Sequence, residues 1–168
     1  MKLVCAWCNI HMGQKHSDIH PEDAITHGIC DECMLKLYKK KQIDFIPFLN
    51  TISAPVVLID ENNTYIAAND KALVKLGKEH SSFQSKRTGD IFSCQNAHLA
   101  GGCGHTKKCG GCQMLNLITE TYEGKHSFSH VPVNLIQKDN NSTQEINLKI
   151  TTENINGMVL MRIDDMKP

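Results

Sequence analysis

The stretch APVVLIDENNTYIAANDKALVKLG, residues 54–77, contains the pattern that decides the fold of most of this 168-residue chain. An apolar, β-branched run at 56–60 ends in a polar Glu-Asn-Asn turn, and extended sequence resumes at 64–67, so a β-hairpin is predicted. Residues 70–76 then predict a short helix that stops at Gly77, because glycine readily takes the left-handed conformation just past a helix. The segment therefore predicts two strands followed by a helix.

Three further strands are predicted near the end of the chain, at 126–137, 144–152 and 157–164. Asp, Asn, Ser and Gly residues separate them, and such short turns favour antiparallel pairing. A helix with one apolar face is predicted before them at Gln113–Tyr122, closely followed by Gly124. The order β-β-α-(Cys loop)-α-β-β-β predicts the α+β class with one antiparallel sheet.

The first forty residues carry two CxxC pairs around a polar, histidine-rich loop. Cys5 and Cys8 form the first pair, and Cys30 and Cys33 form the second after 21 intervening residues. Zinc takes four soft ligands in a tetrahedron, and two CxxC turns supply them. This pattern predicts a structural zinc site that organises a segment with too few core positions to fold well alone.

The competing interpretation of this segment is a pair of unrelated CxxC turns. A helix is predicted from Asp31 to about Lys41, with Cys33 in its first turn and acidic residues at its start. Trp7 lies inside the first CxxC pair, where it either covers the metal or offers an interaction surface. Four cysteines complete a zinc shell, so solvated or indirect roles are assigned to the histidines of the loop: His11, His16, His20 and His27.

A second group of four cysteines lies in a glycine-rich stretch between the predicted helices. Its members are separated by eight, five and two residues: Cys94, Cys103, Cys109 and Cys112. Five of the eleven residues from 101 to 111 are glycine, which predicts tight, positive-φ backbone with amide N–H groups close to the sulfur atoms. Cys112 directly precedes the helix predicted at Gln113, and a helix N-terminus favours the thiolate form.

Three interpretations of this second group stay open. A second zinc site is one. An iron–sulfur cluster is another, because it suits four thiolates among backbone donors, although the spacing matches neither common ferredoxin pattern. The third is a metal-free dithiol switch. The CGGC segment is similar to a thioredoxin-like active site, but no βαβ unit surrounds it, which argues against a catalytic version.

Residues 45–166 resemble a PAS domain, a small sensory fold with a five-stranded antiparallel sheet and helices on one face. The carrying segments are residues 54–77, the TGDIF sequence at Thr88–Phe92 and the three closing strands, and Asn69 and Ala72 occupy the N-xx-A positions. The resemblance implies that the second cysteine group lies in the connection between the second and third strands. That connection flanks the pocket where many PAS domains hold a ligand, which implies a sensing role by analogy.

The predicted organisation has three parts. Residues 1–42 form a four-cysteine, zinc-binding module of the ribbon or treble-clef type, 43–53 a connector helix, and 54–168 a PAS-like domain with a Cys-rich insertion at 94–112. The THGIC-x-x-C segment, Thr26–Cys33, is similar to short four-cysteine modules found ahead of PAS domains in some bacterial signalling proteins. No flavin-photosensor motif and no CxxC followed by His is present, which disfavours flavin and covalent haem.

Composition narrows the functional classes. The chain has 18 basic and 18 acidic residues, and this balance argues against bulk nucleic acid or an anionic membrane as a partner. No apolar run approaches the roughly 20 residues of a membrane span, and no signal peptide is evident, so a cytoplasmic location is expected. No phosphate-binding loop with its Lys and no Gly-x-Ser-x-Gly is present, so an enzyme is not expected.

The sequence therefore predicts a cytoplasmic signal-sensing or regulatory protein. Its second cysteine group is the expected metal or redox site that controls interaction with a partner. The expected partners are a second copy of the chain, bound through the connector helix or the PAS sheet, and a signalling protein. The alternative is a non-sensing interaction module in which both four-cysteine sites bind zinc for purely structural reasons.

Overall fold

The computed structural model describes residues 1–14, 21, 24–34, 36 and 45–168. By its contacts the chain divides into two compact units, Met1–Ile43 and Asp44–Pro168. The last part of the helix predicted to end near Lys41 lies outside the described residues, as do His16 and His20.

The first unit contains a small three-stranded sheet. Its strands are β1 (Lys2–Cys5), β2 (His11–Gln14) and β3 (Ile25–Gly28). The central strand, β1, pairs antiparallel with β2 and parallel with β3. Residues 31–34 are helical, so Cys30 directly precedes a helix and Cys33 lies in its first turn, as expected. The first CxxC pair lies at the end of β1, and the second lies at the start of this helix.

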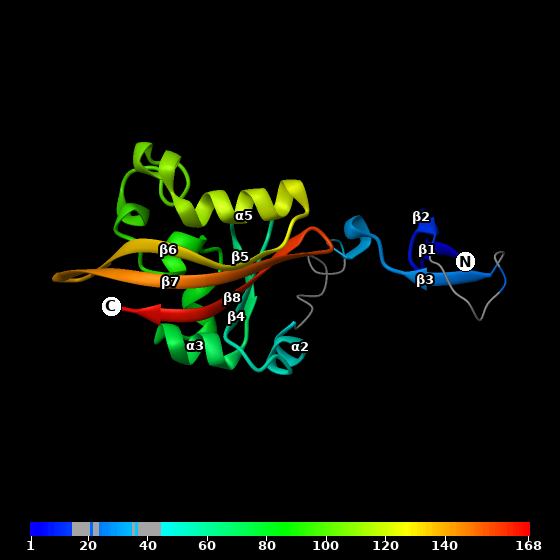
Figure 1. Cartoon of the computed structure of the whole chain (residues 1–168), viewed down its shortest axis with the longest axis horizontal. Coiled ribbons are helices and arrows are strands. Elements are labelled where there is room, and N and C mark those ends of the chain that lie inside the picture. Colours follow the sequence, from blue (N-terminus) through cyan, green and yellow to red (C-terminus); the bar gives the residue numbers. More distant parts are fainter. Residues whose placement is uncertain (15–20, 22–23, 35, 37–44) are drawn as a thin grey trace. The chain divides into compact units, whose positions relative to one another are not determined.

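The second unit is built on a five-stranded antiparallel sheet with the spatial order β5-β4-β8-β7-β6 (Figure 1). Its strands are β4 (Val56–Ile59), β5 (Tyr65–Ala68), β6 (Phe128–Asp139), β7 (Ser142–Ile155) and β8 (Met158–Lys167). The hairpin β4–β5 and the meander β6–β7–β8 were both expected, and β8 joins them by pairing with β4. This arrangement confirms the predicted α+β, PAS-like fold.

Short helices and one long helix occupy the connections. They are α2 (Ile46–Asn50), α3 (Asp70–Leu76), η1 (His80–Phe83), α4 (Thr88–Ile91), η2 (Gln95–His98), η3 (Lys107–Gly111) and α5 (Gln113–Gly124). Helix α3 has the predicted bounds, with Gly77 left-handed at φ 64°. Helix α5 runs two residues past its predicted end. Gly124 is still helical, and Lys125 takes the left-handed position instead, at φ 51°.

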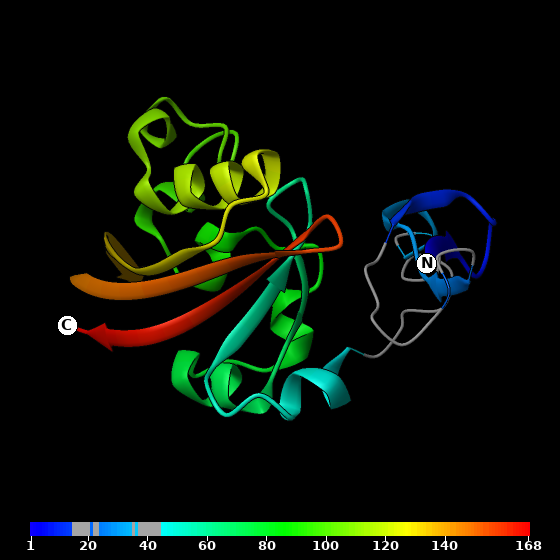
Figure 2. The same cartoon turned by 45° about the vertical axis from the view of Figure 1, so that its right-hand side comes forward.

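The core of the second unit lies between the sheet and these helices. Helix α5 contributes Met114, Leu117 and Ile118. These residues occupy positions i, i+3 and i+4, so they lie on one face of the helix. This face packs against β6, β7 and β8, and both cartoon views show α5 beside the long strands (Figures 1 and 2). Apolar burial therefore holds the helix whose first residue follows Cys112.

One fully buried side chain, Asn69, joins three segments of the second unit. Its Oδ1 accepts hydrogen bonds from the backbone N–H groups of Val56 and Ala72, each at 3.0 Å. Its Nδ2 donates to three carbonyl oxygens of residues 49–54, at 3.2, 3.4 and 2.8 Å. The amide thus caps α3, fixes the first residue of β4 and holds the chain that follows α2.

Replacement of Asn69 by Ala is expected to lower the free energy of unfolding by on the order of 3 kcal/mol, because several buried backbone groups lose their partner at once. Asn69→Asp is expected to be comparably harmful at neutral pH, since an oxygen then faces carbonyl oxygens. Urea titration of the full chain measures both. Asn116→Ala on the exposed side of α5 is the control, with a change under about 0.5 kcal/mol. An equally small change in Asn69→Ala would contradict the assignment.

Candidate functional site

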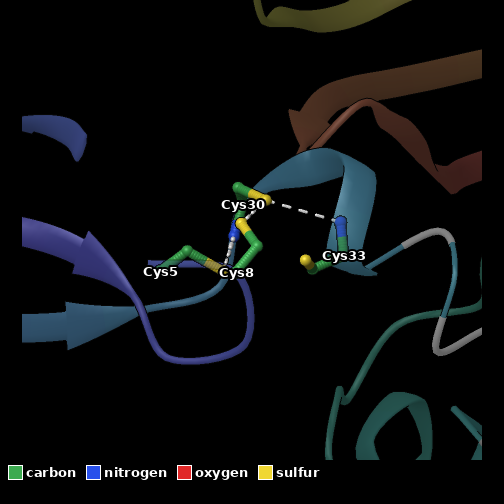
Figure 3. Close-up of side chains that lie close together, drawn as sticks. All are labelled: Cys5, Cys8, Cys30 and Cys33. Carbon is green, nitrogen blue, oxygen red and sulfur yellow. Dashed lines mark hydrogen bonds between the residues drawn. The ribbon is translucent and has the colours of Figure 1, made fainter. Parts of the chain in front are cut away.

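The first four-cysteine group lies where the two CxxC segments of the first unit meet (Figure 3). The sulfur atoms of Cys5, Cys8, Cys30 and Cys33 all lie within 4.8 Å of one another. Those of Cys8 and Cys30 are 3.6 Å apart. Tetrahedral zinc with Zn–S bonds of about 2.3 Å places its sulfur ligands roughly 3.8 Å apart. This group is therefore able to hold a metal ion.

Backbone amides support the sulfur atoms of this group. Cys5 Sγ accepts hydrogen bonds from the N–H groups of Trp7 and Cys30, each at 3.4 Å. Cys30 Sγ accepts one from the N–H of Cys33, also at 3.4 Å. In each pair a tight turn thus points a backbone N–H at the first sulfur, which is how a CxxC segment favours the thiolate form that metals bind.

The thiols of the first group differ in how readily they ionise. Burial opposes ionisation of Cys5, but backbone N–H groups outweigh it and lower the pKa of its thiol to about 6. Burial and hydrogen bonds with neighbouring thiols raise the pKa of Cys33 to about 12. Four adjacent thiolates repel one another, so this group loses all its protons only when a cation offsets their charge.

The second four-cysteine group lies in the connection between β5 and β6, where the PAS resemblance implied it. Cys94, Cys103, Cys109 and Cys112 all line one partly open cavity of about 40 Å³. Cys109 lies in η3, whereas Cys112 directly precedes α5, as expected. The rest of the cavity wall is neutral: Asn63, Thr88, Gly89, Phe92, Asn96, Ala97, Met114, Leu115, Asn134 and Leu135.

Neutral donors reach two of these sulfur atoms. Cys103 Sγ accepts from the backbone N–H of Gly89 at 3.2 Å and from Asn63 Nδ2 at 3.6 Å. Cys109 Sγ is 3.3 Å from the donating N–H of Gly104 and 3.1 Å from Thr106 Oγ1. The glycine-rich loop was expected to supply such a donor, and Gly104 does so. Neither Asn63 nor Gly89 was predicted from the sequence, where their only signals are a turn position and a glycine in TGDIF.

Burial and hydrogen bonding act differently on these two thiols. At Cys103 burial raises the pKa, and the nearby Cys109 and Cys112 raise it further. At Cys109 burial acts in the same direction, but hydrogen bonds with Thr106 and with the N–H of Gly104 outweigh it and lower the pKa. Cys109 therefore ionises more readily than Cys103.

The two groups differ in how close their sulfur atoms lie. Within the described part of the chain, the first group is the one set of three or more possible ligands whose atoms all lie within 4.8 Å of one another. The second group shares a cavity without reaching that spacing. Its backbone also departs from expectation at two of the five glycines. Gly101, Gly102 and Gly104 have positive φ, whereas residues 110–111 lie in η3.

The other polar candidates lie at the surface. The side chain of Trp7 is 61% exposed, which leaves it free to form an interaction surface. Six histidines among the described residues are also exposed: His11, His27, His98, His105, His126 and His130. In the described residues, no helix has the length and apolar character needed to cross a bilayer.

No protein-family model matches this sequence, and no curated protein matches it either. Solved structures with a similar fold are found. The PAS domain of a Desulfitobacterium hafniense protein is 20% identical, with a TM-score of 0.41 over 72% of this chain and 97% of that one.

Two further structures are each 10% identical and cover 80% of this chain. A domain of a sensory box sensor histidine kinase/response regulator from Geobacter sulfurreducens has a TM-score of 0.47, with 96% of it covered. The PAS domain of Bordetella pertussis BvgS has a TM-score of 0.37, with 85% covered. These structures are similar to this chain in fold, and the chemistry of the two cysteine groups is argued from its own residues.

The metal affinity of the first group is expected to fall as the pH is lowered from about 8 to about 6, because its thiols must lose protons to bind. Cys5, with a pKa of about 6, contributes little to this slope. Each thiol with a raised pKa, such as Cys33, lowers the metal affinity by up to about tenfold for each pH unit of acidification. Competition with a chromophoric chelator measures the affinity, with zinc as the probe.

The control for this titration is His27→Ala, which removes an exposed side chain near the group and is expected to leave affinity and slope unchanged. Cys33→Ser is expected to abolish tight binding at this group. An affinity that does not vary with pH would contradict coordination that requires these thiols to lose their protons.

Proposed function

We propose that this is a sensory or regulatory protein in which Cys94, Cys103, Cys109 and Cys112 form a metal or redox site that controls interaction with a partner. The observation that carries the proposal is that all four cysteines line one partly open cavity. Thiols gathered in this way respond together to metal or oxidant. The surrounding PAS-like fold supplies a sheet and helices through which such a response can spread.

Two connections lead from this cavity to the sheet. Cys112 directly precedes α5, which packs against β6, β7 and β8. A short antiparallel bridge joins Cys94 to Gln137 of β6, and the N–H of Lys138 donates to the carbonyl oxygen of Ser93 at 2.8 Å. A change of metal or oxidation state at the cavity would act on both the start of α5 and the outer strand β6.

The first group has a separate, structural role in this proposal, with zinc as its ion. Four thiolates are soft ligands, and the spacing of their sulfur atoms suits a single tetrahedral ion. None of the eight cysteines is in a disulfide, which fits the reducing cytoplasm that we propose as the location. We propose a non-catalytic role for both groups.

The expected partners are part of the same proposal. We propose that the chain forms a homodimer through α2 or the sheet and passes its signal to another protein. The side chain of Phe48 on α2 is 58% exposed, so this helix offers an apolar contact. Bulk nucleic acid and membranes are not proposed as partners, since the net charge is zero.

The alternative is an interaction module in which both cysteine groups are purely structural zinc sites. One observation favours it. The first unit exposes three large apolar side chains, Trp7, Ile10 and Ile25, at 61%, 55% and 60%. A protein contact through this unit would need no chemistry at the second group.

The proposal is tested by comparing full-length protein, prepared without oxygen, before and after chelation or mild oxidation. We expect faster hydrogen exchange in α5 and β6 after either treatment, together with a shift in oligomeric state seen by light scattering. Untreated Cys103→Ser is expected to show the same hydrogen exchange and oligomeric state as the treated unmutated protein. Cys8→Ser, in the first group, is expected to leave the response of α5 and β6 intact. Identical exchange and association in all states would favour the structural alternative.

A further inference from the structure

The CxxC turns of the two cysteine groups fold differently. In the first group, the N–H of Cys33 donates to Cys30 Sγ at 3.4 Å. In the second group, the N–H of Cys112 donates at 3.1 Å to the carbonyl oxygen of Cys109. Cys109 Sγ is instead contacted by Gly104 and Thr106, which precede it in the chain. The CGGC segment therefore lacks the turn geometry with which this same chain builds its single-ion site.

The spacing of the sulfur atoms also separates the two groups. A single zinc ion draws four sulfur atoms to roughly 3.8 Å from one another. The first group lies within 4.8 Å and suits such an ion, whereas the second group is not among the described sets with that spacing. In an iron–sulfur cluster the four thiolates are divided over two or four iron atoms, so they do not all lie at that spacing from one another. Four cysteines that surround one cavity without converging on a point fit a cluster better than an ion.

The cavity wall suits a cluster in its chemistry as well. Its non-cysteine residues are all neutral, with apolar side chains such as Phe92, Met114 and Leu135. Neutral donors, the N–H of Gly89 and the amide of Asn63, reach Cys103 Sγ. Cysteine thiolates with hydrogen bonds to sulfur and limited solvent are the setting in which iron–sulfur clusters are held and their potentials adjusted.

We infer that this cavity binds a polynuclear iron–sulfur cluster rather than a zinc ion. Its ligands are the four thiolates of the second group, each of which loses a proton on binding iron: Cys94, Cys103, Cys109 and Cys112. The inference rests on the proposed function, because it names the occupant of the same regulatory site. It also gives Asn63, in the β4–β5 turn, a role as a positioning residue for the cluster.

The amide of Asn63 is oriented by the residues around it. This side chain is buried, and its Oδ1 accepts a hydrogen bond from Thr88 Oγ1. The N–H of Thr88 donates to the carbonyl oxygen of Asn63 at 3.3 Å. Because the oxygen is taken by the hydroxyl, the NH₂ group faces Cys103 Sγ, at 3.6 Å. A donor held in this way stabilises the more negative, reduced form of a bound cluster.

The test uses the full chain with its thiols reduced, supplied in the absence of oxygen with ferrous iron, ferric iron, sulfide and zinc together. We expect iron and acid-labile sulfide in equal amounts, more than one of each per chain, with visible absorption of a cluster and about one zinc per chain at the first group. Cys103→Ser is expected to lose the iron and the colour but keep the zinc. Cys8→Ser is expected to do the reverse.

Two variants beside the ligands extend the test. A Cβ added at Gly89 would lie 2.7 Å from Cys103 Sγ, so Gly89→Ala is expected to lower iron occupancy several-fold without loss of zinc. Asn63→Leu is expected to keep iron but to shift the reduction potential of the cluster to a more negative value. An unchanged potential in Asn63→Leu would overturn the role given to that residue.

The outcomes also separate this inference from the proposed function. Colourless protein with two zinc ions per chain would overturn the inference of a cluster. The proposed function would still stand if hydrogen exchange in α5 and β6 responded to chelation of that zinc. Colourless protein with a single zinc would likewise overturn the cluster. Iron-loaded protein whose exchange and association do not respond to cluster loss would support the inference and refute the proposed function.

Discussion

The second unit depends on the buried amide of Asn69. An unpaired amide in a core is costly, and here both ends of the group are satisfied by backbone atoms from three segments. The start of β4 is thereby fixed beside the start of α3. Strand β4 pairs with both β5 and β8, so the same constraint sets the hairpin turn that carries Asn63. That turn reaches Cys103, which links the fold to the candidate site.

The two cysteine groups illustrate two ways of gathering thiols. In the first, each CxxC turn brings its own two sulfur atoms together, and a small sheet brings the turns to one another. A metal ion there would stabilise a unit that has little core of its own. In the second, the cysteines come from a long connection, and the cavity between them is closed by side chains of α4, α5 and β6. A site of this kind shares its wall with α5 and with β6 of the sheet.

The neutral wall of the second cavity makes the hydrogen bonds to its sulfur atoms important. Any charge placed among its apolar side chains is poorly solvated, so the few hydrogen-bond donors that reach the sulfur atoms matter more than they would at the surface. One donor comes from the N–H of Gly89 in α4 and another from the β4–β5 turn. A chemical change at the sulfur atom of Cys103 therefore alters its hydrogen bonds with α4 and with the β4–β5 turn.

The sequence by itself determined the antiparallel α+β architecture, the bounds of α3 and the first cysteine group, because each follows from periodicity or spacing over short distances. The first residue of α5 was predicted correctly from the sequence. The helix ends two residues later than predicted, because Lys125 takes the left-handed position. Only the tertiary structure decided what surrounds the second group. Asn63 and Cys103 are 40 residues apart in the chain, and no local pattern predicts a contact between them. Sheet pairing and core packing bring them together.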